Sequence, residues 1–82
     1  MSNQPLTLYT RAGCALCEDM ASHVTELIEK TRHTLRLVDI DQDATLKARY
    51  GWDVPVLFDG ETELCRHQLN LPLFQEWLRV HA

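Results

Sequence analysis

The sequence has no hydrophobic segment long enough to cross a membrane. Its longest purely apolar stretch has four residues, whereas a membrane-spanning helix needs about 20. The first ten residues contain no basic segment followed by a long apolar one, so we expect no secretory signal peptide and a cytoplasmic protein. Three cysteines are an odd number and too few for a disulfide framework. We therefore expect neither a membrane protein nor a small disulfide-rich secreted one.

Positive charge is also scarce. Eight Lys and Arg residues stand against twelve Asp and Glu, which gives a formal net charge of −4. The basic residues are scattered along the chain, so we expect no nucleic-acid partner. Low-complexity segments and repeats are absent, and 45% of the residues are hydrophobic, as in ordinary folded domains. We expect residues 1–82 to form a single, monomeric domain.

Hydrophobic patterning predicts alternating strands and helices. Strands are expected at 6–10, 34–40, 54–58 and 61–66, and helices at roughly 15–31, from Asp41 or Asp43 to Gly51, and after Asn70. Asp59 and Gly60 separate the last two strands and suit a type I′ turn, in which both central residues have positive φ. The order β-α-β-α-β-β-α, with the first two strands parallel, predicts an α/β fold whose sheet is covered by helices.

The chemistry of the sequence is concentrated in one Cys-x-x-Cys motif, Cys14 and Cys17. Cys14 follows the first strand and opens the first helix, where free N–H groups and the helix dipole favour a thiolate. We therefore expect its pKa to lie below the free value of about 8.5. Arg11 adds positive charge nearby. Cys17 lies on the apolar side of the helix and should be more buried, so the pair is expected to combine an exposed nucleophile with a shielded resolving thiol.

Metal binding is the alternative interpretation of this pair. Cys-x-x-Cys supplies two zinc ligands at a suitable spacing, and Cys65 and His67 could complete a Cys₃His site. However, Cys17 is predicted to lie inside a helix rather than on a tight turn, and Cys-x-His is not a usual second ligand pair. We therefore expect redox chemistry here and no metal site.

Three segments together resemble the glutaredoxins. The stretch Tyr9–Cys17 is similar to the active-site segment of that family, and Val38–Asp41 and Tyr50–Leu57 are similar to the rest of its core. The resemblance covers roughly residues 5–80. It implies a thioredoxin fold with a four-stranded mixed sheet of order 2-1-3-4. It also implies a cis Pro55 that faces Cys14, and a Val54 backbone that pairs with the bound thiol substrate.

The sequence departs from the glutaredoxin pattern in three places. Ala15 replaces the proline common after the first cysteine, Asp53 replaces a frequent threonine, and the glycine pair expected after the last strand is missing from the stretch 66–70. Arg11 matches a basic position that contacts glutathione in the family, and Val54 retains the backbone contact. We therefore expect glutathione to be a weak or incomplete ligand.

Other features receive structural interpretations. Asp39, Asp41 and Asp43 resemble the start of a calcium loop, but the following positions lack the required glycine and glutamate, so strand-end and helix-cap roles are expected. Trp52 is expected to pack near the Pro55 loop. Cys65 is expected to be a packing residue outside the catalytic cycle.

The resemblance and the motif together predict a thiol–disulfide oxidoreductase, an electron carrier in cell redox homeostasis. Cys14 would attack a protein or small-molecule disulfide, and Cys17 would resolve the mixed disulfide. No bound cofactor is expected; glutathione or a flavin-dependent reductase would regenerate the dithiol. Two alternatives remain open: a thioredoxin-fold binding module without turnover, and cysteine-based metal binding.

Overall fold

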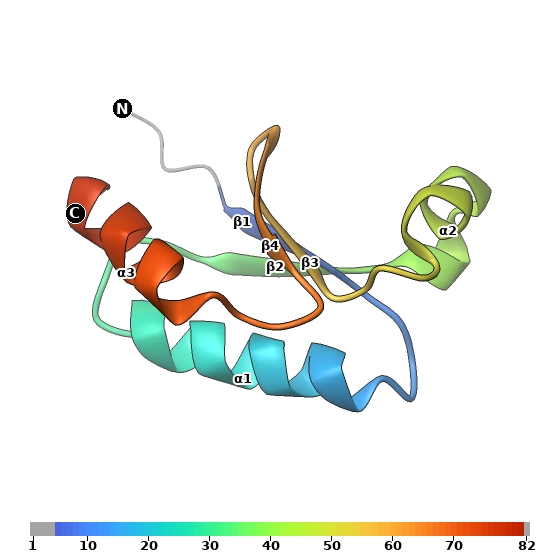
Figure 1. Ribbon diagram of the computed structural model, residues 1–82, viewed down its shortest axis with the longest axis horizontal. Helices are drawn as coiled ribbons and strands as arrows, with labels where there is room; N and C mark the ends of the chain where they lie inside the picture. The colour runs from blue at the N-terminus through green and yellow to red at the C-terminus, as the bar shows by residue number, and fades with distance from the viewer. Residues whose placement is uncertain (1–4, 82) are drawn as a thin grey trace.

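A computed structural model describes residues 5–81 (Figure 1). Its four strands and three α-helices follow one another in the predicted order. A short 3₁₀ turn, η1, was not predicted. The elements are β1 (Leu6–Thr10), α1 (Ala15–Ile28), β2 (Leu35–Asp39), η1 (Ile40–Gln42), α2 (Ala44–Tyr50), β3 (Val56–Asp59), β4 (Thr62–Arg66) and α3 (Leu71–Val80). The predicted domain boundaries 1 and 82 lie outside the described residues. No helix among residues 5–81 is both long and apolar enough to span a membrane.

The sheet has the strand order β2-β1-β3-β4, as the resemblance implied. β1 and β2 are parallel, with Leu6 opposite Leu35. β3 is antiparallel to both β1 and β4. The thioredoxin-fold prediction is therefore confirmed, including the parallel crossover through α1.

Each face of the sheet has its own hydrophobic core, because successive strand residues point to opposite faces. On one face, Leu6, Leu8 and Leu57 pack against α1 and α3. On the other face, Val56 packs in a smaller core with residues from η1 and α2, and Tyr9 and Phe58 border it. The central strands are thus covered on both sides.

The first helix is shorter than predicted. It ends at Ile28, three residues before the expected boundary. Both the backbone N–H and the hydroxyl of Thr31 donate to the carbonyl of Ile28, at 2.9 and 2.7 Å. A threonine hydroxyl competes with the helical hydrogen-bond pattern, so the chain turns here towards β2.

The hairpin between β3 and β4 is confirmed, but its turn differs from the prediction. Asp59 belongs to β3 and pairs with Thr62, so the central residues are Gly60 and Glu61. Gly60 has φ 60°, and no non-glycine residue of this turn has positive φ. Glycine at the first central position with positive φ is the pattern of a type II′ turn. The type I′ prediction centred on Asp59 and Gly60 is therefore wrong.

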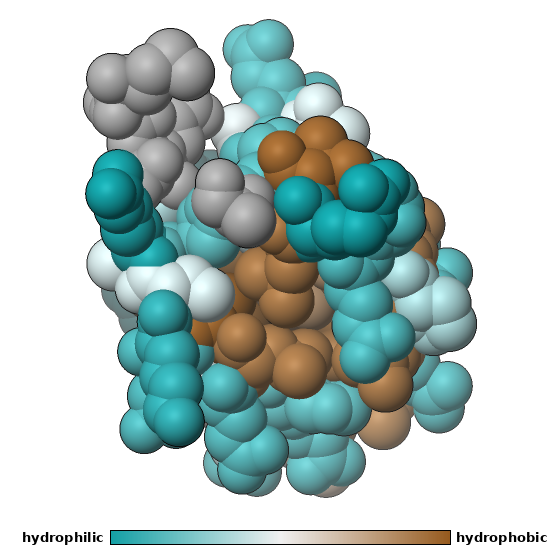
Figure 2. Space-filling model, turned by 90° about the vertical axis from the view of Figure 1, so that its left-hand side faces the viewer, coloured by the Kyte–Doolittle hydropathy of each residue, from teal (hydrophilic) through white to brown (hydrophobic). Residues whose placement is uncertain are grey.

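Hydrophobic surface is not confined to the neighbourhood of the cysteines. Figure 2 shows the opposite end of the molecule, and apolar atoms are visible there between hydrophilic side chains. The exposed large hydrophobic residues include Leu37 on β2 and Val80 on α3 as well as Leu16 in the cysteine motif. Because apolar exposure is ordinary on protein surfaces, exposure alone does not mark a binding site in this protein.

Candidate active site

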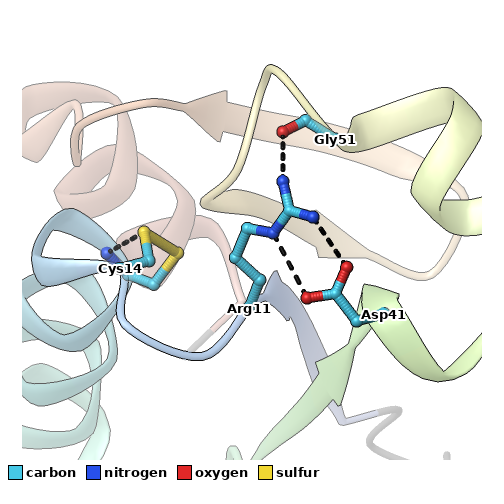
Figure 3. Close-up of a disulfide and its surroundings, with 5 residues drawn as sticks. Arg11, Cys14, Asp41 and Gly51 are labelled. Atoms are coloured by element: carbon cyan, nitrogen blue, oxygen red, sulfur yellow. Dashed lines mark hydrogen bonds and ion pairs between the residues drawn. A yellow bond between two sulfur atoms is a disulfide. The ribbon is translucent and has the colours of Figure 1, made fainter.

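The two motif cysteines lie at the start of α1 and form a disulfide (Figure 3). Their Cα atoms are 5.2 Å apart. Gly13, with φ +73°, turns the chain from β1 into the helix in a conformation that side chains rarely adopt. Cys14 is the N-cap of α1, and its sulfur accepts a hydrogen bond from the backbone N–H of Cys17 at 3.1 Å. The helix N-terminus therefore directs a donor at the sulfur of Cys14.

The exposure of the two sulfur-bearing residues is asymmetric, as predicted. Cys17 is 2% exposed and lies on the same side of α1 as Met20 and Val24. Cys14 is half-buried. A molecule in solution can therefore approach Cys14 more readily than Cys17.

The loop that contains Pro55 lies at the same end of the sheet as the cysteine motif. Tyr9 pairs with Val56 in the antiparallel β1–β3 ladder, so the preceding Pro55 comes next to Thr10. The Val54–Pro55 peptide bond is cis, which the resemblance implied. The backbone N–H of Val54 donates to the carbonyl of Tyr50 at 3.1 Å. A substrate that paired with this N–H would have to displace that internal bond.

Arg11 connects three segments of the chain and is not a free cation. Its Nε and Nη2 donate to the carboxylate of Asp41 at 3.3 and 2.7 Å, and its Nη1 donates to the carbonyl of Gly51 at 2.9 Å. Figure 3 shows the guanidinium directed at these two partners. The hydrogen bond and the charge of Asp41 raise the pKa of Arg11, and the same hydrogen bond lowers the pKa of Asp41. Arg11 thus connects the segment between β1 and α1 to η1 and to the end of α2.

A second arginine at this end of the sheet was not predicted as a site residue. Arg66 pairs with Val56 across the β3–β4 ladder. Its Nε and Nη2 each lie 2.6 Å from a carboxylate oxygen of Glu63, and its Nη1 lies 3.0 Å from Asp53. The Arg66 hydrogen bond lowers the pKa of Glu63. The only sequence signal was Asp53 itself, at a position where glutaredoxins often have threonine.

His67 links the end of β4 to the cis-proline loop. Its backbone N–H donates to the carbonyl of Pro55 at 2.8 Å, and its Nε2 lies 3.6 Å from Asp53. It is the one non-glycine residue among 5–81 with clearly positive φ, 70°. This backbone region is costly for a residue with a side chain, and it occurs where the family's glycine pair is missing.

The position expected for Trp52 is wrong, because its side chain is 95% exposed. Tyr50 fills the neighbouring core instead: it is 8% exposed, and its ring stacks on Tyr9 with centroids 4.8 Å apart. The backbone N–H groups of Asp53 and Val54 both donate to the carbonyl of Tyr50. This turn places Trp52 on the outside of the loop.

The predicted packing position of Cys65 agrees with the structure. Cys65 is opposite Leu57 in the β3–β4 ladder, borders the core beneath α1 and α3, and forms no disulfide. Burial raises the pKa of its thiol, and a hydrogen bond from the backbone of Asn70 acts in the opposite direction. No group of three or more His, Cys, Asp or Glu side chains within residues 5–81 is arranged to hold a metal ion.

Two of the three aspartates that resemble a calcium loop act as caps. The Asp39 carboxylate accepts from the backbone N–H of Asp41, and that of Asp43 accepts from Thr45 and Leu46 at the start of α2. The expected strand-end and helix-cap roles of Asp39 and Asp43 are confirmed, whereas Asp41 binds Arg11.

Comparison with known proteins identifies relatives over nearly the whole chain. The solution structure of protein Ne2328 from Nitrosomonas europaea is 34% identical, with a TM-score of 0.77, over 94% of this chain and 98% of that one. The X-ray structure of XcR50 from X. campestris is 35% identical, with a TM-score of 0.70, over 92% and 96% of the two chains. The uncharacterized protein Mb0520 of Mycobacterium bovis is 36% identical over 80 residues, which cover 85% of this chain and 82% of that protein.

A family model agrees with these relatives. The model described as Glutaredoxin-like domain (DUF836) matches residues 5–79, which include the cysteine motif, the cis-proline loop and all three α-helices except the last residue of α3. The chain belongs to this glutaredoxin-like family.

Proposed function

We propose that this protein is a cytoplasmic thiol–disulfide oxidoreductase that carries electrons in cell redox homeostasis. The observation that carries the proposal is the Cys14–Cys17 pair: a disulfide at a helix N-terminus with one accessible and one buried cysteine. A helix N-terminus stabilises a thiolate, which is the nucleophile in disulfide exchange. Membership of a glutaredoxin-like family supports the same chemistry.

The proposed reaction moves two electrons from the dithiol to the substrate. The Cys14 thiolate attacks one sulfur of a substrate disulfide; a mixed disulfide forms, and the other substrate sulfur leaves as a thiolate. The Cys17 thiol loses its proton and attacks the Cys14 sulfur. The second substrate thiolate leaves, and the Cys14–Cys17 disulfide remains. The substrate is reduced, and the protein is oxidised.

The oxidised protein must then be reduced by an external thiol donor. Glutathione or the dithiol of a flavin-dependent reductase would supply the two electrons, and no resident cofactor is needed. We propose that Val54 and Pro55 form the edge along which the substrate lies. We assign Arg11 mainly to positioning, since Asp41 and Gly51 accept hydrogen bonds from each of its three guanidinium nitrogens.

Three cysteine variants test this proposal in a reductase assay with a neutral small disulfide. Cys14→Ser should abolish turnover, because it removes the nucleophile. Cys17→Ser should accumulate a mixed disulfide on Cys14 that mass spectrometry detects. Cys65→Ser is the matched control and should retain activity, because Cys65 lies in the β3–β4 ladder and outside the disulfide.

The binding-module alternative predicts a different result. If the wild-type protein in its reduced form leaves all disulfides tested unreduced, the proposed function is wrong. A Cys14–Cys65 or Cys17–Cys65 disulfide in peptide maps of the oxidised monomer would contradict the assigned roles of the cysteines.

A further inference from the structure

The charges around the cysteine motif are not arranged to attract an anionic ligand. Arg11 is bound to Asp41, and Arg66 is bound to both Glu63 and Asp53. A carboxylate of an incoming molecule would have to compete with these internal carboxylates for either guanidinium; Figure 3 shows the Arg11–Asp41 pair. Such a molecule would also approach a protein with a formal net charge of −4, which slows the encounter of like charges.

A groove of about 200 Å³ begins at the cysteine motif. One wall is α1, with the exposed Leu16, Asp19 and His23 above the buried Met20. The other wall is the loop after β4, with His67, Gln68 and Leu69. Leu16 lies between the two cysteines in the sequence and is 46% exposed. Leu16 therefore connects the groove to the cysteine motif, although neither Cys14 nor Cys17 is among the lining residues.

The position of the groove relative to the cis-proline loop is set by the backbone. The N–H of His67 donates to the carbonyl of Pro55, so the second wall of the groove is attached to the loop beside the motif. A substrate attacked by Cys14 can extend its neighbouring residues over this surface, because Leu16 belongs both to the motif and to the groove. A side chain one or two residues from the substrate cysteine can therefore reach the groove.

The lining of the groove fits a long basic side chain. Leu16 and Leu69 supply apolar surface, and Asp19 is an exposed carboxylate that forms no ion pair within residues 5–81. Lysine and arginine bury their aliphatic stems on apolar surface and hold the charged group at its polar border. His23, His67 and Gln68 are the other polar lining residues, so Asp19 is the only carboxylate among the residues that line the groove.

We propose that this groove binds a lysine or arginine side chain of the substrate, so that the protein reduces protein disulfides flanked by a basic residue in preference to glutathione disulfide. The inference rests on the proposed thiol–disulfide exchange at Cys14. Asp19 is the specificity-determining residue, and it acts on substrate binding rather than on the exchange of sulfur atoms.

The experiment compares peptide disulfides that differ in one residue. Three peptides carry the same internal disulfide with lysine, norleucine or glutamate beside one cysteine, and glutathione disulfide is the fourth substrate. The rate of oxidation of the reduced full-length protein should be about fivefold higher for the lysine peptide than for the glutamate peptide, the scale of one exposed ion pair. The difference should shrink in about 1 M salt, and glutathione disulfide should react more slowly than the lysine peptide.

Asp19→Asn tests the assignment of the groove. It should raise KM for the lysine peptide, leave kcat little changed, and leave the norleucine peptide unaffected. Glu26→Gln removes one negative charge from an exposed position farther along the same helix and should preserve the preference for lysine. Glu26→Gln changes the net charge by the same amount as Asp19→Asn, so it separates a local contact between Asp19 and the lysine from an effect of the net charge.

The outcomes distinguish the two proposals. Equal rates for the lysine and glutamate peptides, a faster reaction of glutathione disulfide, or an unchanged lysine preference in Asp19→Asn would overturn the groove assignment while the oxidoreductase function stands. Failure to oxidise the protein with any of the four substrates would overturn the proposed function, and this inference with it.

Discussion

The N-cap of α3, Asn70, follows the loop that forms one wall of the groove, and its contribution to stability can be tested by mutation. The side chain of Asn70 accepts a hydrogen bond from the backbone N–H of Leu73 at 3.2 Å, and its backbone carbonyl accepts from Phe74 at 2.9 Å. Asn70→Ala removes the first bond and retains the second. One of the free N–H groups at the helix start then loses its protein acceptor.

The expected loss in the free energy of unfolding is about 1 kcal/mol, the usual effect of removing an N-cap side chain. In a domain of this size, about 1 kcal/mol lowers Tm by about 4–8 °C. Asn70→Asp is the matched variant, because its carboxylate can accept the same hydrogen bond and lies at the positive end of the helix. It should unfold within about 2 °C of the wild-type protein.

Thermal unfolding of the oxidised proteins, followed by circular dichroism, measures both effects. Oxidised samples keep the Cys14–Cys17 disulfide the same in each protein. An Asn70→Ala variant with the wild-type Tm, or an Asn70→Asp variant no more stable than Asn70→Ala, would refute the capping argument. An equal loss of stability in both variants would show that the stability depends on a property of Asn70 other than its side-chain hydrogen-bond acceptor.

Three further predictions follow from the site and the core. In the reduced protein, iodoacetamide should label Cys14 before Cys17, since Cys17 is only 2% exposed; equal labelling by mass spectrometry would contradict this. Phe74→Ala should lower the free energy of unfolding in urea by about 3–5 kcal/mol, because Phe74 is fully buried; a small loss would show that the site collapses. Arg11 lowers the pKa of Asp41 below 3.8, so their pair stabilises the protein above that pH and the effect is lost as pH falls through the lowered pKa. Arg11→Gln should therefore reduce Tm more near pH 6 than near pH 2.5, and an equal reduction at both would be the contrary result.

Most of the fold was predictable because its signals are local. Cys14, Asp43 and Asn70 each precede an apolar helical pattern and carry a side chain that can accept from the helix start, and all three are N-caps. Alternating hydrophobic residues located the strands within one or two residues. The turn between β3 and β4 was misassigned because strand pairing continues through Asp59, and the end of a ladder depends on both strands.

The ion pairs required information from distant parts of the chain. Arg11 and Asp41 are 30 residues apart and meet because β1 and β2 are parallel neighbours, with Thr10 opposite Asp39. The pair could have been inferred once that register was assumed. The position of Arg66 next to Asp53 depends on the β3–β4 pairing, which is irregular between Leu57 and Phe58. Sequence pattern does not predict such an irregularity.

The two arginines also show why the identity of a residue is a weak guide to its role in recognition. A positive charge at Arg11 suggested a contact to glutathione, and that contact stays a prediction. Recognition needs unoccupied donors, and three of the five N–H donors of Arg11 already have acceptors within the chain. Asp41, which engages two of them, was expected to have only a strand-end or helix-cap role. Whether a charge near Cys14 can bind a partner therefore depends on whether it remains unpaired after folding, and Asp19 forms no ion pair within residues 5–81.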